Sequence, residues 1–136
     1  MREIQILLAE DNRADIVMVQ EALAAHDIAH QLQIAVNGEE AIAFIKRMGK
    51  PDQSPCPDIF LLDLNLPRVD GLDVLREFRR HPECAATPVI VMSSSNSLRE
   101  REAADALGVS RYFAKPSSYD SFTQLGRIVR DVLGGN

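Results

Sequence analysis

Residues 59–67 read Ile-Phe-Leu-Leu-Asp-Leu-Asn-Leu-Pro, and the other elements of the chain are organised around them. Four consecutive large apolar residues predict a strand buried on both faces, as in parallel sheets covered by helices. The run ends on Asp63, so we expect this carboxylate at the carboxyl end of the strand, where open α/β sheets bind ligands. The stretch alone leaves a second interpretation open, in which Asp63 only caps a loop.

Strands and helices alternate along the rest of the chain. Apolar runs predict strands at 4–9, 31–36, 59–62, 88–92 and 111–114. Amphipathic spacing and turn residues predict helices at about 14–25, 38–48, 71–80, 97–107 and 119–133. Right-handed crossovers between parallel strands place helices on both faces of one sheet. The predicted fold class is therefore α/β, a doubly wound five-stranded parallel sheet of flavodoxin-like order 2-1-3-4-5 with five helices.

Two segments depart from this regular pattern. Residues 49–57 contain three prolines and one glycine, which predicts an extended loop. The helix at 97–107 is the least apolar, because residues 99–102 form one fully charged turn.

Composition limits the classes of protein. The 136 residues, 46% hydrophobic and 26% charged, predict one globular domain with its core at about 3–133. The net charge of −5 gives no support for nucleic-acid binding. No apolar run approaches the roughly 18 residues of a membrane span, and the first residues lack the long apolar region of a signal peptide, so we expect a cytoplasmic protein away from membranes. Cys56 and Cys84 lack the spacing of a zinc or redox motif and are expected to be free thiols.

Chemically specific side chains follow four of the predicted strands. They are Glu10 and Asp11, Asp63, Ser93 and Ser94, and Lys115. Because the carboxyl ends of parallel strands lie on one edge of a sheet, we expect these groups to converge. Each has a purely structural interpretation: an acidic pair at a helix start, a helix cap, an exposed turn. Their coincidence at four strand ends favours a functional site.

The chemistry of this set points to phosphoryl transfer. Gathered carboxylates repel one another, and a hard divalent cation such as Mg²⁺ relieves the repulsion. A lysine and a serine hydroxyl add a positive charge and a hydrogen-bond donor for an anion. A carboxylate nucleophile, a metal and fixed donors are the parts that phosphoryl transfer requires.

Over essentially its full length the chain resembles the receiver domain of bacterial two-component response regulators. The matching motifs are Leu-Leu-Ala-Glu-Asp-Asn at 7–12, Leu-Asp-Leu-Asn-Leu-Pro at 62–67 with Asp-Gly at 70–71, Pro-Val-Ile-Val-Met-Ser at 88–93, and Tyr112 with Lys115-Pro116. A looser similarity, carried by residues 63–68 and the Pro-rich loop, is to single-domain regulators paired with phytochrome-type kinases.

The resemblance implies a role for each matching residue. Asp63 is the implied phosphoacceptor, and Ser93 and Lys115 are the groups that bond the phosphoryl group. The implied switch residues are Ser93, which moves to bond the phosphoryl group, and Tyr112, which turns inward on activation. The Lys115–Pro116 peptide matches one that is usually cis. The implied ligands of Mg²⁺ (or Mn²⁺) are Glu10, Asp11, Asp63 and the backbone carbonyl of Asn65. Serine replaces the commoner threonine at 93, and Ser94 follows, so which hydroxyl engages the phosphoryl group stays open.

The resulting expectation is a stand-alone receiver without an output domain, since only Gly134, Gly135 and Asn136 follow the last predicted helix. It would take a phosphoryl group from a sensor histidine kinase, or from a histidine phosphotransfer protein, and signal through a partner or a homodimer. It would be no enzyme beyond its own phosphorylation and dephosphorylation.

Four alternatives stay open. They are a phosphorelay shuttle, an aspartyl-phosphate hydrolase, an FMN carrier, and a degenerate receiver used only for binding. Asn65 stands where such hydrolases carry a second aspartate, and Glu10-Asp11 would repel the FMN phosphate.

Overall fold

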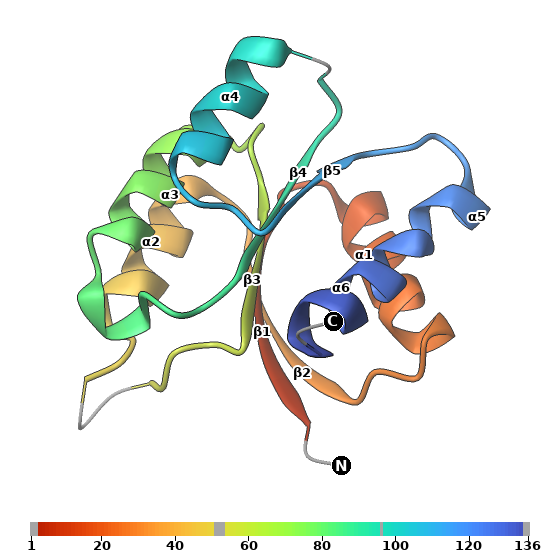
Figure 1. The fold of residues 1–136 in the computed structure, drawn as a ribbon, viewed down its shortest axis with the longest axis horizontal. Coiled ribbons are helices and arrows are strands. Elements are labelled where there is room, and N and C mark those ends of the chain that lie inside the picture. Colours follow the sequence, from red (N-terminus) through yellow and green to blue (C-terminus); the bar gives the residue numbers. More distant parts are fainter. Residues whose placement is uncertain (1–2, 51–53, 96, 135–136) are drawn as a thin grey trace.

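The structure is a computed structural model that describes residues 3–50, 54–95 and 97–134. Its centre is a five-stranded parallel sheet of order β2-β1-β3-β4-β5, which confirms the predicted fold class (Figure 1). The strands are β1 (Ile4–Ala9), β2 (His30–Ala35), β3 (Ile59–Asp63), β4 (Val89–Ser93) and β5 (Arg111–Ala114). Every residue of β3 and β4 is buried, as expected for strands in the middle of a covered sheet.

Helices cover both faces of the sheet (Figure 1). One face carries α1 (Arg13–Ala25), α5 (Tyr119–Phe122) and α6 (Gln124–Gly134). The other carries α2 (Gly38–Lys46), α3 (Gly71–Arg79) and α4 (Leu98–Ala106). The hydrophobic core accordingly forms two clusters, one on each side of the sheet.

Side-chain caps start the helices at the site edge of the sheet. Asn12, Asp70 and Ser97 each accept a hydrogen bond from a backbone N–H in the first turn of the helix that follows. The start of α3 also needs a glycine, because a Cβ on Gly71 would collide with the backbone of Leu64. These contacts fix where each chain segment turns at the carboxyl end of its strand.

Two local elements differ from the prediction. The helix expected at 119–133 forms two segments, α5 and α6, separated at Thr123. The Thr123 hydroxyl donates to the backbone carbonyl of Asp120 at 2.7 Å, a local bond that competes with regular helix. A short 3₁₀ helix, η1 (Pro82–Cys84), follows α3 and has proline in its favoured first position.

The prediction of two free thiols is wrong, because Cys56 and Cys84 form a disulfide. They are 28 residues apart in sequence, and η1 brings the buried Cys84 against the loop before β3. A search for short-range cysteine motifs could not detect a pair that only the fold brings together.

Several residues lie outside the described parts of the chain. They are residues 51–53 of the Pro-rich loop, Asn96 after β4, and Gly135 and Asn136 at the end.

Among the helices that are described, none is both long and apolar enough to cross a lipid bilayer.

Candidate functional site

Three carboxylates meet at the carboxyl end of the central strands. Glu10 and Asp63 are buried, whereas Asp11 is exposed at the rim. One oxygen of each lies within 4.8 Å of one oxygen of the others. Glu10 and Asp11 follow β1 and Asp63 ends β3, and these two strands are paired neighbours, so the register of the sheet itself brings the carboxylates together.

Lys115 neutralises part of this negative charge. Its Nζ donates to Glu10 Oε1 at 2.7 Å, Asp15 Oδ2 at 2.8 Å and Asp63 Oδ2 at 3.0 Å. Burial alone would lower the pKa of Lys115. The hydrogen bonds to Asp15 and Glu10 and the charges of Asp63 and Glu10 outweigh burial and raise the pKa above its ordinary value. Lys115 is therefore a permanent cation bonded to three carboxylates.

One lysine does not balance the cluster. Burial is the main cause that raises the pKa of Glu10 to about 7, and contact with Asp63 adds to it, while Lys115 partly opposes the shift. The donor set is thus rich in oxygen ligands and short of positive charge, which fits a hard divalent cation such as Mg²⁺. Glu10, Asp11 and Asp63 are the side chains that could hold the ion.

Asp63 is held in place from both sides. Its Oδ1 accepts the backbone N–H of Asn65 at 2.9 Å, and its Oδ2 accepts Lys115 Nζ. These two hydrogen bonds fix the orientation of the Asp63 carboxylate beside the other two acids.

Ser93 and Tyr112 lie on the α4 side of the site. Ser93 is fully buried, whereas Ser94 is exposed, which favours Ser93 as the hydroxyl that faces the site. Ser93 Oγ contacts Asn65 Oδ1 at 3.3 Å and Glu100 Oε1 at 2.7 Å. The Tyr112 hydroxyl donates to Glu100 Oε1 at 3.1 Å. Burial is the main cause that raises the pKa of Tyr112. Glu100 raises it further, although the hydrogen bond with Ser93 lowers it.

Two contributors, Asp15 and Glu100, were not anticipated from the sequence. Asp15 lies on α1, four residues after Asp11. This spacing, about one helical turn, is the sequence signal that could have placed Asp15 near the acidic pair. Glu100 lies three residues after Ser97, the spacing of a helix capping box. Both patterns are common on helix surfaces, and only tertiary structure shows that these side chains turn toward the site.

The Lys115–Pro116 peptide differs from the form that the resemblance implies. No peptide bond of the described residues is cis, so this one is trans. Trans is the intrinsically favoured isomer of an X–Pro bond.

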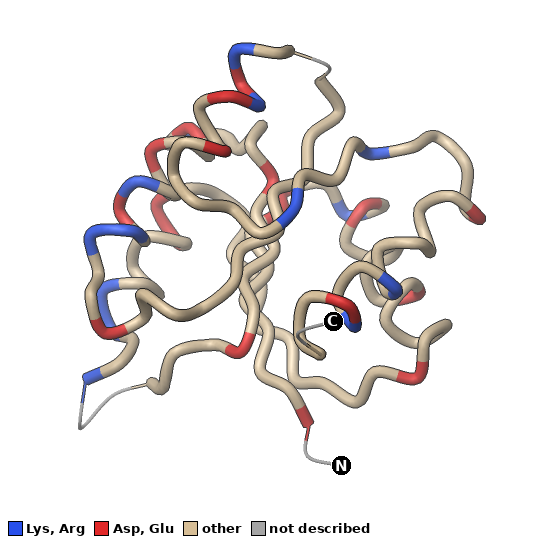
Figure 2. Tube along the Cα trace, viewed as in Figure 1, with Lys and Arg blue, Asp and Glu red and all other residues tan. Residues whose placement is uncertain are grey.

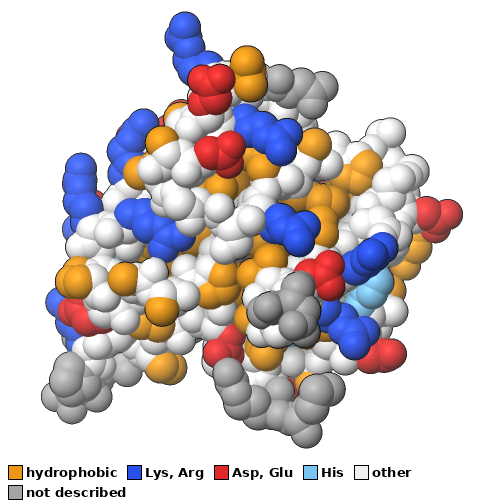
Figure 3. Space-filling model, viewed as in Figure 1, with side chains coloured by type: hydrophobic (Ala, Val, Ile, Leu, Met, Phe, Trp, Pro, Cys, Tyr) orange, Lys and Arg blue, Asp and Glu red, His pale blue; other side chains and the backbone are white. Residues whose placement is uncertain are grey.

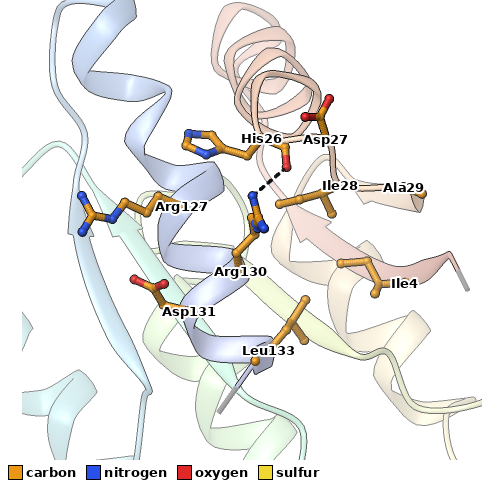
Figure 4. Close-up of a pocket in the computed structure, with 10 residues that line it drawn as sticks. Ile4, His26, Asp27, Ile28, Ala29, Arg127, Arg130, Asp131 and Leu133 are labelled. Carbon is orange, nitrogen blue, oxygen red and sulfur yellow. Dashed lines mark hydrogen bonds between the residues drawn. The ribbon is translucent and has the colours of Figure 1, made fainter. Parts of the chain in front are cut away.

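A separate hollow lies at the opposite edge of the sheet (Figure 4). Its volume is about 780 Å³, and it lies between the start of β1, the end of α1 and α6. Arg127, Arg130 and His26 line it beside Asp27 and Asp131, and Arg130 Nη1 contacts the His26 carbonyl at 3.5 Å. Cations and acids are mixed there, and none of the strand-end residues takes part.

Comparison with known proteins agrees with this geometry. The profile of the response regulator receiver domain matches residues 6–126. The response regulator Rcp1 of Synechocystis sp. is 41% identical over 110 residues, which are 81% of this chain and 75% of Rcp1. The solved Mn²⁺-bound form of Rcp1 superposes with a TM-score of 0.82 at 35% identity, covering 94% of this chain and 92% of that one.

Two further solved structures are similar. The phosphorylated cyanobacterial phytochrome response regulator RcpA has a TM-score of 0.86 at 33% identity, and the match covers 97% of this chain and 94% of RcpA. The receiver domain of the sensor histidine kinase PA1611 from Pseudomonas aeruginosa, with magnesium coordinated in its active-site cleft, has a TM-score of 0.77 at 25% identity. That match covers 98% of this chain and 99% of the other.

Proposed function

Because the chain belongs to the response regulator receiver domain family, we propose that it accepts a phosphoryl group on Asp63 from a phosphohistidine donor. The observation that carries the proposal is the position of the Asp63 carboxylate. It is buried beside Glu10 and Asp11, and Lys115 contacts it directly. This is the arrangement that a carboxylate nucleophile needs near a bound metal and a cation.

The residues have distinct tasks in this reaction. An oxygen of Asp63 attacks the phosphorus atom of a phosphohistidine whose other ring nitrogen carries a proton. The new P–O bond forms as the P–N bond breaks, and the electron pair of that bond stays on the departing nitrogen, so neutral imidazole leaves. Lys115 then pairs with a phosphoryl oxygen, and Ser93 donates its hydroxyl to another. Glu10, Asp11, Asp63 and the Asn65 carbonyl would hold Mg²⁺ or Mn²⁺, which would supply positive charge beside the transferred group.

The switch follows from the added charge. A phosphorylated side chain carries about −1.5 to −2 charge at neutral pH. Ser93 and Lys115 move toward it, α4 repacks, and Tyr112 turns inward. The α4–β5–α6 face then signals through a partner or through a homodimer.

The donor in this proposal is a cytoplasmic, phytochrome-type sensor histidine kinase. The support is the similarity to RcpA, which is described as a phytochrome response regulator. We propose that the chain works as one receiver domain, in line with its 94% coverage of RcpA. A histidine phosphotransfer protein is the second candidate donor, which would make the chain a phosphorelay intermediate.

Phosphorylation by a small donor tests this function. The purified chain is treated with phosphoramidate, with Mg²⁺ or with EDTA, and its intact mass is measured. We expect one phosphoryl adduct with Mg²⁺ only, none on Asp63→Asn, and a normal adduct on Asp105→Asn, an exposed carboxylate of α4. An adduct on Asp63→Asn equal to that of the wild type would exclude Asp63 as the acceptor. Turnover of small phosphoesters that depends on Asp63 would favour the hydrolase alternative.

A further inference from the structure

Glu100, in the first turn of α4, bonds two residues from outside its own helix. Its Oε1 accepts the Ser93 hydroxyl at the end of β4 and the Tyr112 hydroxyl of β5. We propose that Glu100 is a positioning residue that holds both hydroxyls in the unphosphorylated arrangement and competes with the phosphoryl group for Ser93. The inference rests on the proposed phosphorylation of Asp63.

The competition follows from the single proton of a serine hydroxyl. Ser93 Oγ can donate to only one acceptor at a time. Glu100 Oε1 lies 2.7 Å from Ser93 Oγ and Asn65 Oδ1 lies 3.3 Å from it. The carboxylate is the closer acceptor, so Ser93 donates its hydrogen bond to Glu100. Ser93 Oγ also accepts the Ser95 N–H at 3.0 Å. Ser93 therefore cannot donate to a phosphoryl group until it leaves Glu100.

Glu100 has an alternative partner within its own helix. Ser97 caps α4 by accepting the Glu100 N–H at 3.2 Å, which is half of a capping box. In the other half, the glutamate side chain would accept the Ser97 N–H, but Ser95 Oγ takes that position at 3.0 Å. A Glu100 side chain repelled by a phosphoryl dianion can turn back to this helix start, where the helix dipole favours a negative charge.

The packing of α4 allows such a change at one end only. Ala104 is its single fully buried residue, and basic and acidic residues alternate along the sequence of its first turn (Figure 2). Charged and apolar side chains lie side by side on the surface around α4 (Figure 3). At its far end, Arg79 donates to the carbonyls of Leu107 at 2.8 Å and Gly108 at 3.0 Å. Loss of the Glu100 bonds would release the start of α4 while Arg79 keeps its end in place.

Binding of beryllium fluoride in the presence of Mg²⁺ tests the inference, because this anion mimics a phosphoryl group on a carboxylate. Wild type, Glu100→Ala, Glu100→Gln and Glu102→Ala are titrated, with tyrosine fluorescence as the readout. We expect Glu100→Ala to bind about 5- to 10-fold more tightly, since a charge-assisted bond no longer has to break. Glu100→Gln keeps the side-chain volume and a weaker acceptor, so its affinity for beryllium fluoride should lie between those of wild type and Glu100→Ala. Glu102 is an exposed carboxylate of the same helix, and its removal should change affinity by no more than about twofold.

A double variant separates positioning from a general effect on the helix. If Glu100 acts through the Ser93 hydroxyl, Glu100→Ala should give no gain in a Ser93→Ala background. The same gain in that background, or equal affinity of wild type and Glu100→Ala, would overturn the inference and leave the function of Asp63 intact. A wild type that neither binds beryllium fluoride nor is phosphorylated on Asp63 would overturn both.

Discussion

Lys115 is the residue on which the charge balance of the site depends. It is the common partner of Glu10, Asp15 and Asp63, and only 9% of its side chain is exposed. The carboxylates around Lys115 raise the pKa of the lysine, whereas burial is the main cause that raises the pKa of Glu10, with contact to Asp63 adding to it. Binding of a metal and transfer of a phosphoryl group would each rearrange the same set of bonds.

Replacement of Lys115 by methionine should destabilise the metal-free protein. It leaves buried carboxylates without their cation, and breaking a buried ion pair costs about 3–5 kcal/mol, here at the lower end because Glu10 can take up a proton. Urea unfolding in EDTA measures the loss. Mg²⁺ should restore part of it, and a Lys115→Met variant as stable as wild type in EDTA would contradict this description.

The raised pKa of Glu10 predicts a pH-dependent affinity for Mg²⁺. The ligand must be ionised, so a proton competes with the metal below the pKa of about 7. Affinity should rise with pH by up to about tenfold per unit below pH 7 and level off above it. Calorimetric titrations between pH 5.5 and 8.5 measure this, and a flat profile over that range would show that Glu10 is already ionised or is no ligand.

At the scale of elements, α3 and α4 differ in how they are anchored. Four residues of α3 are buried, and Gly71 brings its start against the backbone at Leu64. One residue of α4 is buried, Glu100 joins its start to Ser93, and Arg79 bonds the carbonyl of Leu107 at its end. Few buried apolar contacts mark a segment of low local stability, which is where switching elements are found.

Hydrogen exchange should therefore separate the two helices. Amides of α4 should exchange faster than those of α3 in the unmodified protein. Beryllium fluoride with Mg²⁺ should change the protection of α4 and leave α3, the internal control, nearly unchanged. Identical protection of α4 with and without the mimic would contradict its role as the switching element.

At the scale of the whole molecule, the two edges of the sheet have separate tasks. The carboxyl edge carries the acidic cluster, Lys115 and the proposed switch residues Ser93 and Tyr112. The disulfide of Cys56 and Cys84 lies just before β3 and β4, at the amino edge. The disulfide should stabilise the fold without taking part in the chemistry.

Removal of the disulfide tests this separation. Closing a loop of 28 residues lowers the entropy of the unfolded chain by an amount worth about 3.5 kcal/mol of stability. The variant Cys56→Ser/Cys84→Ala should show this loss in urea unfolding and keep the wild-type yield of phosphorylation per folded molecule. Unchanged stability would show that the bridge is absent in solution.

Much of this architecture could be predicted from the sequence because strong local patterns encode it. The apolar runs at 59–62 and 88–92 identify buried parallel strands, and the polar residue that follows each run identifies the site edge. What could not be predicted depends on contacts between distant segments. The Cys56–Cys84 bridge, the bond from Asp15 to Lys115 and the turn of Glu100 toward Ser93 have no local signature that separates them from ordinary surface residues.

The most direct test of the proposed function is to locate the phosphoryl group itself. The chain is phosphorylated by phosphoramidate with Mg²⁺ and treated with borohydride, which reduces an acyl phosphate to an alcohol, and its peptides are then sequenced by mass spectrometry. We predict that Asp63 is converted to homoserine and that Glu10, Asp11 and Asp15 are unchanged. Conversion of any of these three carboxylates in place of Asp63 would contradict the proposed function.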